Sequence, residues 1–279
     1  MFKIIADSCC DLINAKKLFE EVPRVPLHLL VNGKDYTDDR NINLDQLLTD
    51  IDASPEVPKT QCPAPDSYLQ AIKDSEEDEI FIVTLTSKLS GSYNSALLAV
   101  NLYLEEHDDK KIHVFDSRSA SAGELAIVNR IYKLIDESCS FNTIVEKIEY
   151  YIKNECTLYA LLENLDTLAK NGRLTKMQSM LTSLAKIKLV LTAKEGEIVL
   201  KAKAMTMGQG IAKAIKEIQE SGLDLSNRTL FISHCDALEL AETFKRKALI
   251  KCDFKNIEIF NTSGLSSVYA NRGGIIVAF

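Results

Sequence analysis

One stretch of the sequence combines an apolar strand, a polar turn and the start of a helix. The apolar residues 80–83 are followed by LTSKLSGSYNSA at residues 85–96, which we call the serine turn, and then by the apolar residues 97–100. This order is the building unit of α/β folds, which place such turns at the carboxyl edge of a sheet. Hydroxyls and free helix N–H groups can bind an anionic head group there. Serines before a helix are also ordinary caps, so both interpretations stay open.

Apolar runs of strand length alternate with helical periodicity through the first half of the chain. Asn32-Gly33 favours a β-hairpin turn, and four prolines within residues 54–65 predict an extended loop. Strands that alternate with helices imply a mostly parallel sheet with right-handed crossovers. We expect strands at residues 2–6, 79–84 and 111–115, and helices at 14–22, 44–51 (capped by Asn43), 66–73, from the serine turn to about 106, 120–137 and 141–154.

The second half of the chain has shorter helices and more strands, including a hairpin turn at Glu195-Gly196. This order is typical of an α+β arrangement. We therefore expect two domains, residues 1–155, with a hairpin insertion near 25–37, and residues 156–279. The expected strands of the second domain are 157–161, 187–192, 198–203, 229–233, 256–260 and 274–279, and the expected helices are 165–169, 176–184, 210–220 and 237–250.

Charge and composition exclude several classes of protein. A net charge of −7 and a pI near 5.3 argue against a nucleic-acid partner. No apolar run reaches the roughly 18 residues of a membrane span, and the short apolar start is not a signal-peptide core, so we expect a cytoplasmic protein. Seven cysteines without a C-x-x-C pair favour free thiols. The four histidines, at positions 28, 107, 113 and 234, lack metal-ligand spacing, so no metal is expected.

Small polar residues follow three predicted strands, at Asp7-Ser8, in the serine turn and at Asp116-Ser117 with Ser119 and Ser121. If the strands are parallel, these loops meet at one sheet edge together with Thr60 and form the rim of a pocket. No phosphate-binding glycine motif is present. Nucleophilic catalysis by Ser90 or Cys9 with His234 is a second hypothesis, although no G-x-S-x-G elbow supports it.

Six stretches, spread over nearly the whole chain, resemble the DegV family, which includes the fatty-acid-binding subunits of bacterial fatty acid kinase. The serine turn and the segment around Gly172-Arg173 are the most specific of them. In chain order the stretches are Asp7-Ser8 with Asp11-Leu12, VPLHLLVNGKDYTD from Val25, KTQCPAP from Lys59, SKLSGSYNSA from Ser87, FDSRSASAG from Phe115 and LAKNGRLTK from Leu168.

The resemblance implies a Rossmann-like N-terminal α/β domain, an α+β C-terminal domain with a split sheet, and one bound long-chain fatty acid such as palmitate. By similarity, Thr60 and Ser90 hydrogen-bond the carboxylate, with Ser92, Asn94 and Arg173 near it. Family members of the kinase-subunit type present the acyl group to a separate kinase catalytic subunit. The chain is then a lipid-binding protein without cofactor or catalysis of its own. A serine-dependent acyl hydrolase that uses Ser90 and His234 is the alternative.

Two positions depart from the family pattern. A histidine common in an H-x-G-P-G stretch is replaced by Asn261, in the sequence NTSGL, and a common arginine is replaced by Lys203. Lysine keeps the charge but not the planar fork of arginine. Both positions are implicated in the head-group region or in partner use. Lipid binding is still expected. Whether the bound acid is converted to acyl phosphate stays open. A third hypothesis is an interaction protein that keeps the fold but has lost its kinase partner.

Overall fold

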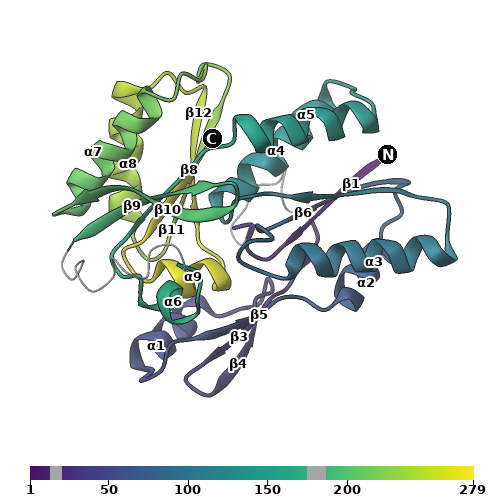
Figure 1. Ribbon diagram of the computed structural model, residues 1–279, viewed down its shortest axis with the longest axis horizontal. Helices are drawn as coiled ribbons and strands as arrows, with labels where there is room; N and C mark the ends of the chain where they lie inside the picture. The colour runs from purple at the N-terminus through teal and green to yellow at the C-terminus, as the bar shows by residue number, and fades with distance from the viewer. Residues whose placement is uncertain (13–20, 175–186) are drawn as a thin grey trace.

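The computed structural model describes residues 1–12, 21–174 and 187–279. The helices expected at 14–22 and 176–184 lie mostly or wholly outside these residues. Within them the chain forms a four-stranded, a six-stranded and a three-stranded sheet (Figure 1). No helix in the described ranges has the length and apolar character needed to cross a bilayer.

The four-stranded sheet has the order β2-β1-β6-β7 and is parallel throughout. In β6 the side chains of Ile80 and Ile82 pack toward one face, and those of Phe81 and Val83 pack toward the other. Because both faces are covered, the strand is a continuous apolar run. The strands are β1 (Phe2–Asp7), β2 (Arg24–Val25), β6 (Glu79–Thr84) and β7 (Lys111–Asp116); the helices are α2 (Pro65–Lys73) and α3 (Ser92–Glu106) on one face, and α4 (Ala122–Asp136) and α5 (Phe141–Asn154) on the other.

The six-stranded sheet has the order β10-β9-β8-β13-β11-β12, in which only β11 and β12 are parallel neighbours. Helices α7 and α8 cover its outer face (Figure 1). The predicted fold class, a parallel α/β sheet followed by an α+β part with a sheet of its own, is therefore confirmed. The elements are β8 (Leu158–Leu162), α6 (Asp166–Lys170), β9 (Lys188–Lys194), β10 (Glu197–Ala204), α7 (Met207–Gln219), β11 (Thr229–His234), α8 (Leu238–Lys251), β12 (Asn256–Asn261) and β13 (Ile275–Ala278).

Helix α4 lies between the two large sheets. Its apolar residues share one core with Phe81 and Phe115 of the parallel sheet and with Phe231 and Phe260 of the mixed sheet. The parallel sheet uses strands before residue 155, and the mixed sheet uses strands after it. The domain division at 155/156 stays a prediction, because α4 precedes that point and packs on both sheets.

The small sheet contains the predicted hairpin, β3 (His28–Val31) and β4 (Lys34–Thr37). Its third strand, β5 (Lys59–Gln61), lies in the segment predicted as an extended loop; the backbone is extended there, but its pairing as a strand was not predicted. Antiparallel pairing with β3 places Thr60 opposite Leu29. Helix α1 (Leu44–Ala53) packs beside this sheet and is capped as predicted, because Asn43 Oδ1 accepts the Gln46 N–H at 3.0 Å.

A short helix, α9 (Gly264–Ala270), was not predicted. Asp38 accepts the N–H groups of Gly264 and Leu265, both at 2.8 Å, and Asp11 accepts the N–H of Ser263 at 2.8 Å. These two buried carboxyls fix the start of α9 between the small sheet and the mixed sheet (Figure 1). The helix thereby closes one side of the space that the two large sheets enclose.

Candidate functional site

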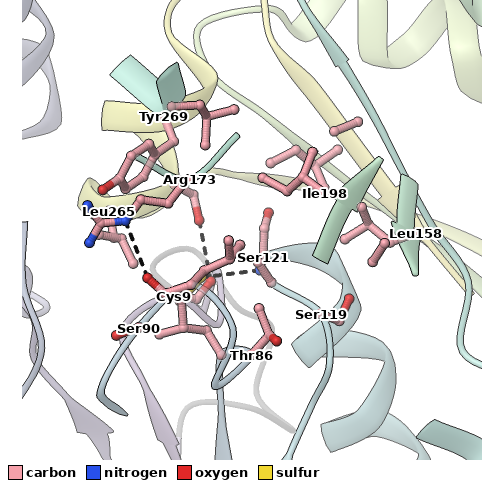
Figure 2. A pocket seen from close by; sticks show the side chains of 18 of the residues that line it. Cys9, Thr86, Ser90, Ser119, Ser121, Leu158, Arg173, Ile198, Leu265 and Tyr269 are labelled. Atoms are coloured by element: carbon pink, nitrogen blue, oxygen red, sulfur yellow. Dashed lines mark hydrogen bonds between the residues drawn. The ribbon is translucent and has the colours of Figure 1, made fainter. Parts of the chain in front are cut away.

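A cavity of about 380 Å³ lies between the carboxyl edge of the parallel sheet and the inner face of the mixed sheet. The loops after β1, β6 and β7 form one wall, and β8, β9 and β10 form the opposite wall (Figure 2). Helix α9 and strand β5 also contribute residues to the lining of the cavity. Most of the lining is apolar, including Leu85, Leu158, Leu162, Leu191, Ile198, Leu265 and Ile276. The sheet edge predicted to form a pocket rim is thus the edge that borders this cavity.

Ser90 of the serine turn lines the cavity. Its Oγ accepts the N–H of Ser92, the first residue of α3, at 3.2 Å. Its own N–H donates to Thr86 O at 3.3 Å, which closes the turn. Because a hydroxyl that accepts one bond still has a proton to donate, Ser90 can hold the helix start and bind an acceptor in the cavity. The capping and binding interpretations are therefore compatible.

Thr60 of β5 reaches the same cavity and is hydrogen-bonded to Tyr269 of α9, with 2.8 Å between Thr60 Oγ1 and Tyr269 Oη. Either hydroxyl can be the donor of this bond. The other proton is then available to an acceptor in the cavity. Tyr269 was missed in the sequence, because α9 itself was missed.

Arg173 brings a positive charge to this end of the cavity. Its Nε donates to Leu89 O at 3.3 Å and its Nη1 to Asn171 O at 2.5 Å. Asn171 in turn donates to Pro58 O at 2.8 Å, which ties this loop to the segment before β5. Figure 2 shows Arg173, Tyr269, Leu265 and Ser90 on one side of the cavity. This side can bind an anion through neutral donors and one guanidinium.

Four other residues singled out in the sequence do not line the cavity. Ser92 is buried under the serine turn, where its Oγ donates to Asp7 Oδ2 at 2.6 Å and meets Tyr68 Oη at 2.6 Å. Asn94 is exposed on α3, because it lies on the helix face opposite the core. Asn261 and Lys203 are exposed near the ends of β12 and β10.

The residues that a serine or cysteine hydrolase would need are arranged unfavourably for nucleophilic catalysis. His234 is not among the residues that line the cavity, and its Nδ1 accepts the Ala237 N–H at 3.2 Å. The neutral ring therefore carries its proton on Nε2, and burial lowers the pKa of the imidazole. Cys9 lines the cavity, but burial, reinforced by the charge of Glu124, raises the pKa of its thiol well above the usual range. A protonated thiol is a poor nucleophile.

Asp7, Cys9 and Glu124 form a buried trio whose potential ligand atoms lie within 4.8 Å of one another. Burial raises the pKa of all three groups, whereas metal binding requires deprotonated ligands. Asp7 is already used, since its oxygens accept the N–H groups of Cys9 at 3.1 Å and Leu85 at 2.9 Å as well as the Ser92 hydroxyl. We interpret the trio as the anchor of the serine turn.

Two more cavity residues come from the loop after β7, Arg118 and Ser119. Ser119 belongs to the run of small polar residues that predicted this loop at the pocket rim, whereas Arg118 was not predicted. Arg118 has a φ of 49°, which turns the chain sharply after Asp116. The run of small polar residues after a strand predicted this loop, as it predicted the serine turn, but it gives no signal for the neighbouring arginine.

Comparison with known proteins gives a consistent result over the whole chain. A family model described as "Uncharacterised protein, DegV family COG1307" matches residues 1–279. A DegV domain-containing protein of Streptococcus pneumoniae, spr0652, is 36% identical over 288 aligned positions, which cover 100% of this chain and 98% of the relative.

Solved structures with the same fold include a DegV family protein from Ruminococcus gnavus refined with vaccenic acid, at 37% identity and a TM-score of 0.93. A DegV family protein from Eubacterium eligens loaded with heptadecanoic acid has 30% identity and a TM-score of 0.90. The fatty acid kinase (Fak) B3 protein of Streptococcus pneumoniae, loaded with linoleic acid, has 34% identity and a TM-score of 0.89. Each comparison covers 100% of this chain and 99% of the other chain.

Proposed function

This chain belongs to the DegV family, and from that premise we propose that it binds one long-chain fatty acid in the cavity between its sheets. The observation that carries the proposal is the uneven polarity of that cavity. Ser90, Tyr269 with its partner Thr60, and Arg173 lie on one side, and leucine and isoleucine side chains line much of the remainder. A carboxylate with a long alkyl tail has the same distribution of polarity.

The tail supplies most of the affinity. Burial of an acyl chain contributes roughly 0.8 kcal/mol per methylene to the free energy of binding. A chain of about sixteen carbons therefore contributes on the order of 10 kcal/mol, before the entropic cost of ordering the chain is subtracted. A hydrogen bond to a charged group contributes only about 1.5 to 3 kcal/mol. The polar end therefore orients the ligand, whereas the apolar wall retains it.

We assign the carboxylate to the hydroxyls of Thr60 and Ser90, with Arg173 beside them. The Thr60–Tyr269 bond at 2.8 Å and the Ser92 N–H bond to Ser90 Oγ at 3.2 Å hold both hydroxyls in place before a ligand arrives. Preorganised donors lose little entropy on binding. We leave Ser92 and Asn94 out of this assignment, because neither lines the cavity.

We further propose that the chain has no catalysis of its own and presents its acyl group to a separate kinase subunit. The support is the similarity to the fatty acid kinase B3 protein and the unfavourable arrangement of the hydrolase residues. Asn261 is exposed, so its difference from the family pattern bears on contact with a partner. Acyl-phosphate formation with a fatty acid kinase, compared between the wild type and Asn261→His, tests this part.

The binding proposal is tested by extraction of the purified protein and by titration of the delipidated protein with palmitate. We expect a copurified long-chain fatty acid, and weaker palmitate binding in Thr60→Ala and Ser90→Ala by about 1 to 3 kcal/mol, because each variant removes one donor from a buried carboxylate. Asn94→Ala is the matched control, since Asn94 is an exposed polar residue of the same turn. A protein that is isolated empty and does not take up palmitate refutes the proposal, and equal affinities in all variants refute the assigned head-group residues.

A further inference from the structure

A second cavity, of about 180 Å³, shares no lining residue with the cavity proposed to hold the fatty acid. It lies where α4, the end of α5 and the loop before β11 meet. Part of its lining is aromatic, and the rest is polar. Its charged residues are Arg130 and Lys133 of α4, Glu155 after α5, and Asp224 and Arg228 of the loop before β11.

Three of these five charged residues interact with one another. Arg228 Nη2 donates to Glu155 Oε2 at 2.6 Å, so these two charges neutralise each other. Arg228 Nε also donates to the main-chain carbonyl of Asp224 at 2.9 Å. The Asp224 carboxylate is used within its own loop, because Oδ1 accepts the N–H of Ser226 at 3.0 Å and its hydroxyl at 2.7 Å. Both acids that line the cavity therefore already have partners.

Arg130 and Lys133 are both half-buried, and no acid is paired with either of them in the described part of the chain. Among the same residues, Arg130 donates no hydrogen bond, and Lys133 Nζ donates one, to Asn227 O at 3.4 Å. Burial lowers the pKa of Lys133, and the charges of Arg130, Lys255 and Arg228 lower it further, although the exposed Glu137 opposes them. Because like charges repel one another, an anion in the cavity would relieve this crowding.

The two cations have the geometry and charge to bind a phosphate group. They lie three residues apart on α4, so their side chains are neighbours on one helix face. A guanidinium fork and an ammonium group are the donors that proteins commonly use for phosphate oxygens. A phosphate monoester carries a charge of about −1.5 to −2 at pH 7, which two cations can balance. Neutral donors also line the cavity, from Asn129, Asn227 and Thr229.

We propose that this cavity binds a phosphate group, either as inorganic phosphate or as part of a small phosphate monoester. The aromatic lining bears on the choice between them. Tyr151, Phe231 and Phe279 present apolar surface that the organic part of a monoester would cover and a free ion would leave uncovered. The site is independent of the proposed fatty-acid binding, because the two cavities have no residue in common.

Isothermal titration calorimetry in a phosphate-free buffer of low ionic strength tests the proposal, with inorganic phosphate, phenyl phosphate and acetate as probes. We expect saturable binding of both phosphates by the wild type and weaker binding of the monoanion acetate. Arg130→Gln and Lys133→Gln should each bind phosphate about 10-fold more weakly or worse, as the loss of a charged hydrogen bond predicts. The matched control is Lys153→Gln, an exposed lysine of α5 that lines neither cavity and should leave the affinity unchanged.

The two phosphate probes also identify the source of the phosphate group. Tighter binding of phenyl phosphate than of inorganic phosphate supports a site for a monoester, and equal affinities support a site for the free ion. The proposal is overturned if the wild type shows no saturable binding of either phosphate, or if the variant that combines Arg130→Gln with Lys133→Gln binds both as tightly as the wild type.

Thermal unfolding checks that a loss of binding reflects the cavity and not the fold. Without phosphate the double variant should melt close to the wild-type temperature, because it removes one long hydrogen bond and no ion pair of the described residues. At constant ionic strength, phosphate should raise the melting temperature of the wild type and of Lys153→Gln but not of the double variant. An equal rise in all three proteins would also overturn the proposal. Palmitate binding should be unchanged in the double variant, so the outcome for one cavity does not decide the other.

Discussion

The two hydroxyls at the polar end of the cavity are positioned in different ways. Ser90 is held within its own turn, by the N–H of Ser92 two residues along the chain. Thr60 is held by Tyr269, which is 209 residues away in the sequence. The geometry of Ser90 is therefore local and visible in the sequence, whereas that of Thr60 depends on the docking of α9. A substitution that displaces α9 should therefore shift the Thr60 hydroxyl more than the Ser90 hydroxyl.

The contact between Gly123 and Ser119 leads to a prediction about stability. In Gly123→Ala the new methyl group would overlap Ser119 Oγ, which would lie 1.8 Å from it, so we expect a loss of about 1 to 3 kcal/mol by overpacking despite the better helix propensity of alanine. Chemical denaturation measures this loss. Adding Ser119→Gly removes both Ser119 atoms near the new methyl group and should restore most of it. A double variant no more stable than Gly123→Ala would contradict this account.

Elements whose limits depend on local signals were predicted well, and those that depend on distant partners were missed. The predicted bounds of α5 and β6 agree with the structure, because residue periodicity and the cap at Ser140 define them locally. Helix α9 has seven residues, and its first N–H groups are held by Asp11 and Asp38 from the other end of the chain. Strand β5 exists through its pairing with β3. Ser90, Thr60 and Ser119 were placed at the pocket rim by the polar turns that follow the strands, Arg173 was added by the resemblance, and Tyr269 required the assembled cavity.

The anchoring of α9 predicts a pH dependence of stability. Burial raises the pKa of Asp38 from 3.8 to about 6, although Arg24, at 3.6 Å, and the α9 N–H groups favour the charged form. Because the folded state then binds the proton more tightly than the unfolded state, this carboxyl destabilises the fold as the pH rises from about 4 through 6, by roughly 3 kcal/mol in total. Asp38→Asn should lack this component. Denaturation of both proteins between pH 4 and 7.5 measures the difference, and parallel pH profiles would contradict the prediction.

At the scale of the whole molecule, α4 joins the two large sheets into one packed body. Its buried residues contact Phe81 and Phe115 on one side and Phe231 and Phe260 on the other, in a single core. The cavity lies in the same intersheet space, so its two walls belong to different sheets. A ligand that contacts both walls should therefore stabilise both sheets together, by an amount set by its concentration and affinity.

This arrangement predicts that the two sheets unfold as one cooperative unit. Ile72 of α2 is fully buried in the core between α2, α3 and the parallel sheet, and no residue of the mixed sheet belongs to that core. Ile72→Ala should cost about 2 to 5 kcal/mol. Because α4 couples the sheets, hydrogen exchange monitored by mass spectrometry should show a comparable loss of protection in β6 and in the distant β11. Ile127→Ala, in the core that both sheets share, is the reference that should affect both strands in either case. Loss of protection in β6 with unchanged β11 in Ile72→Ala would mean that the two sheets unfold independently.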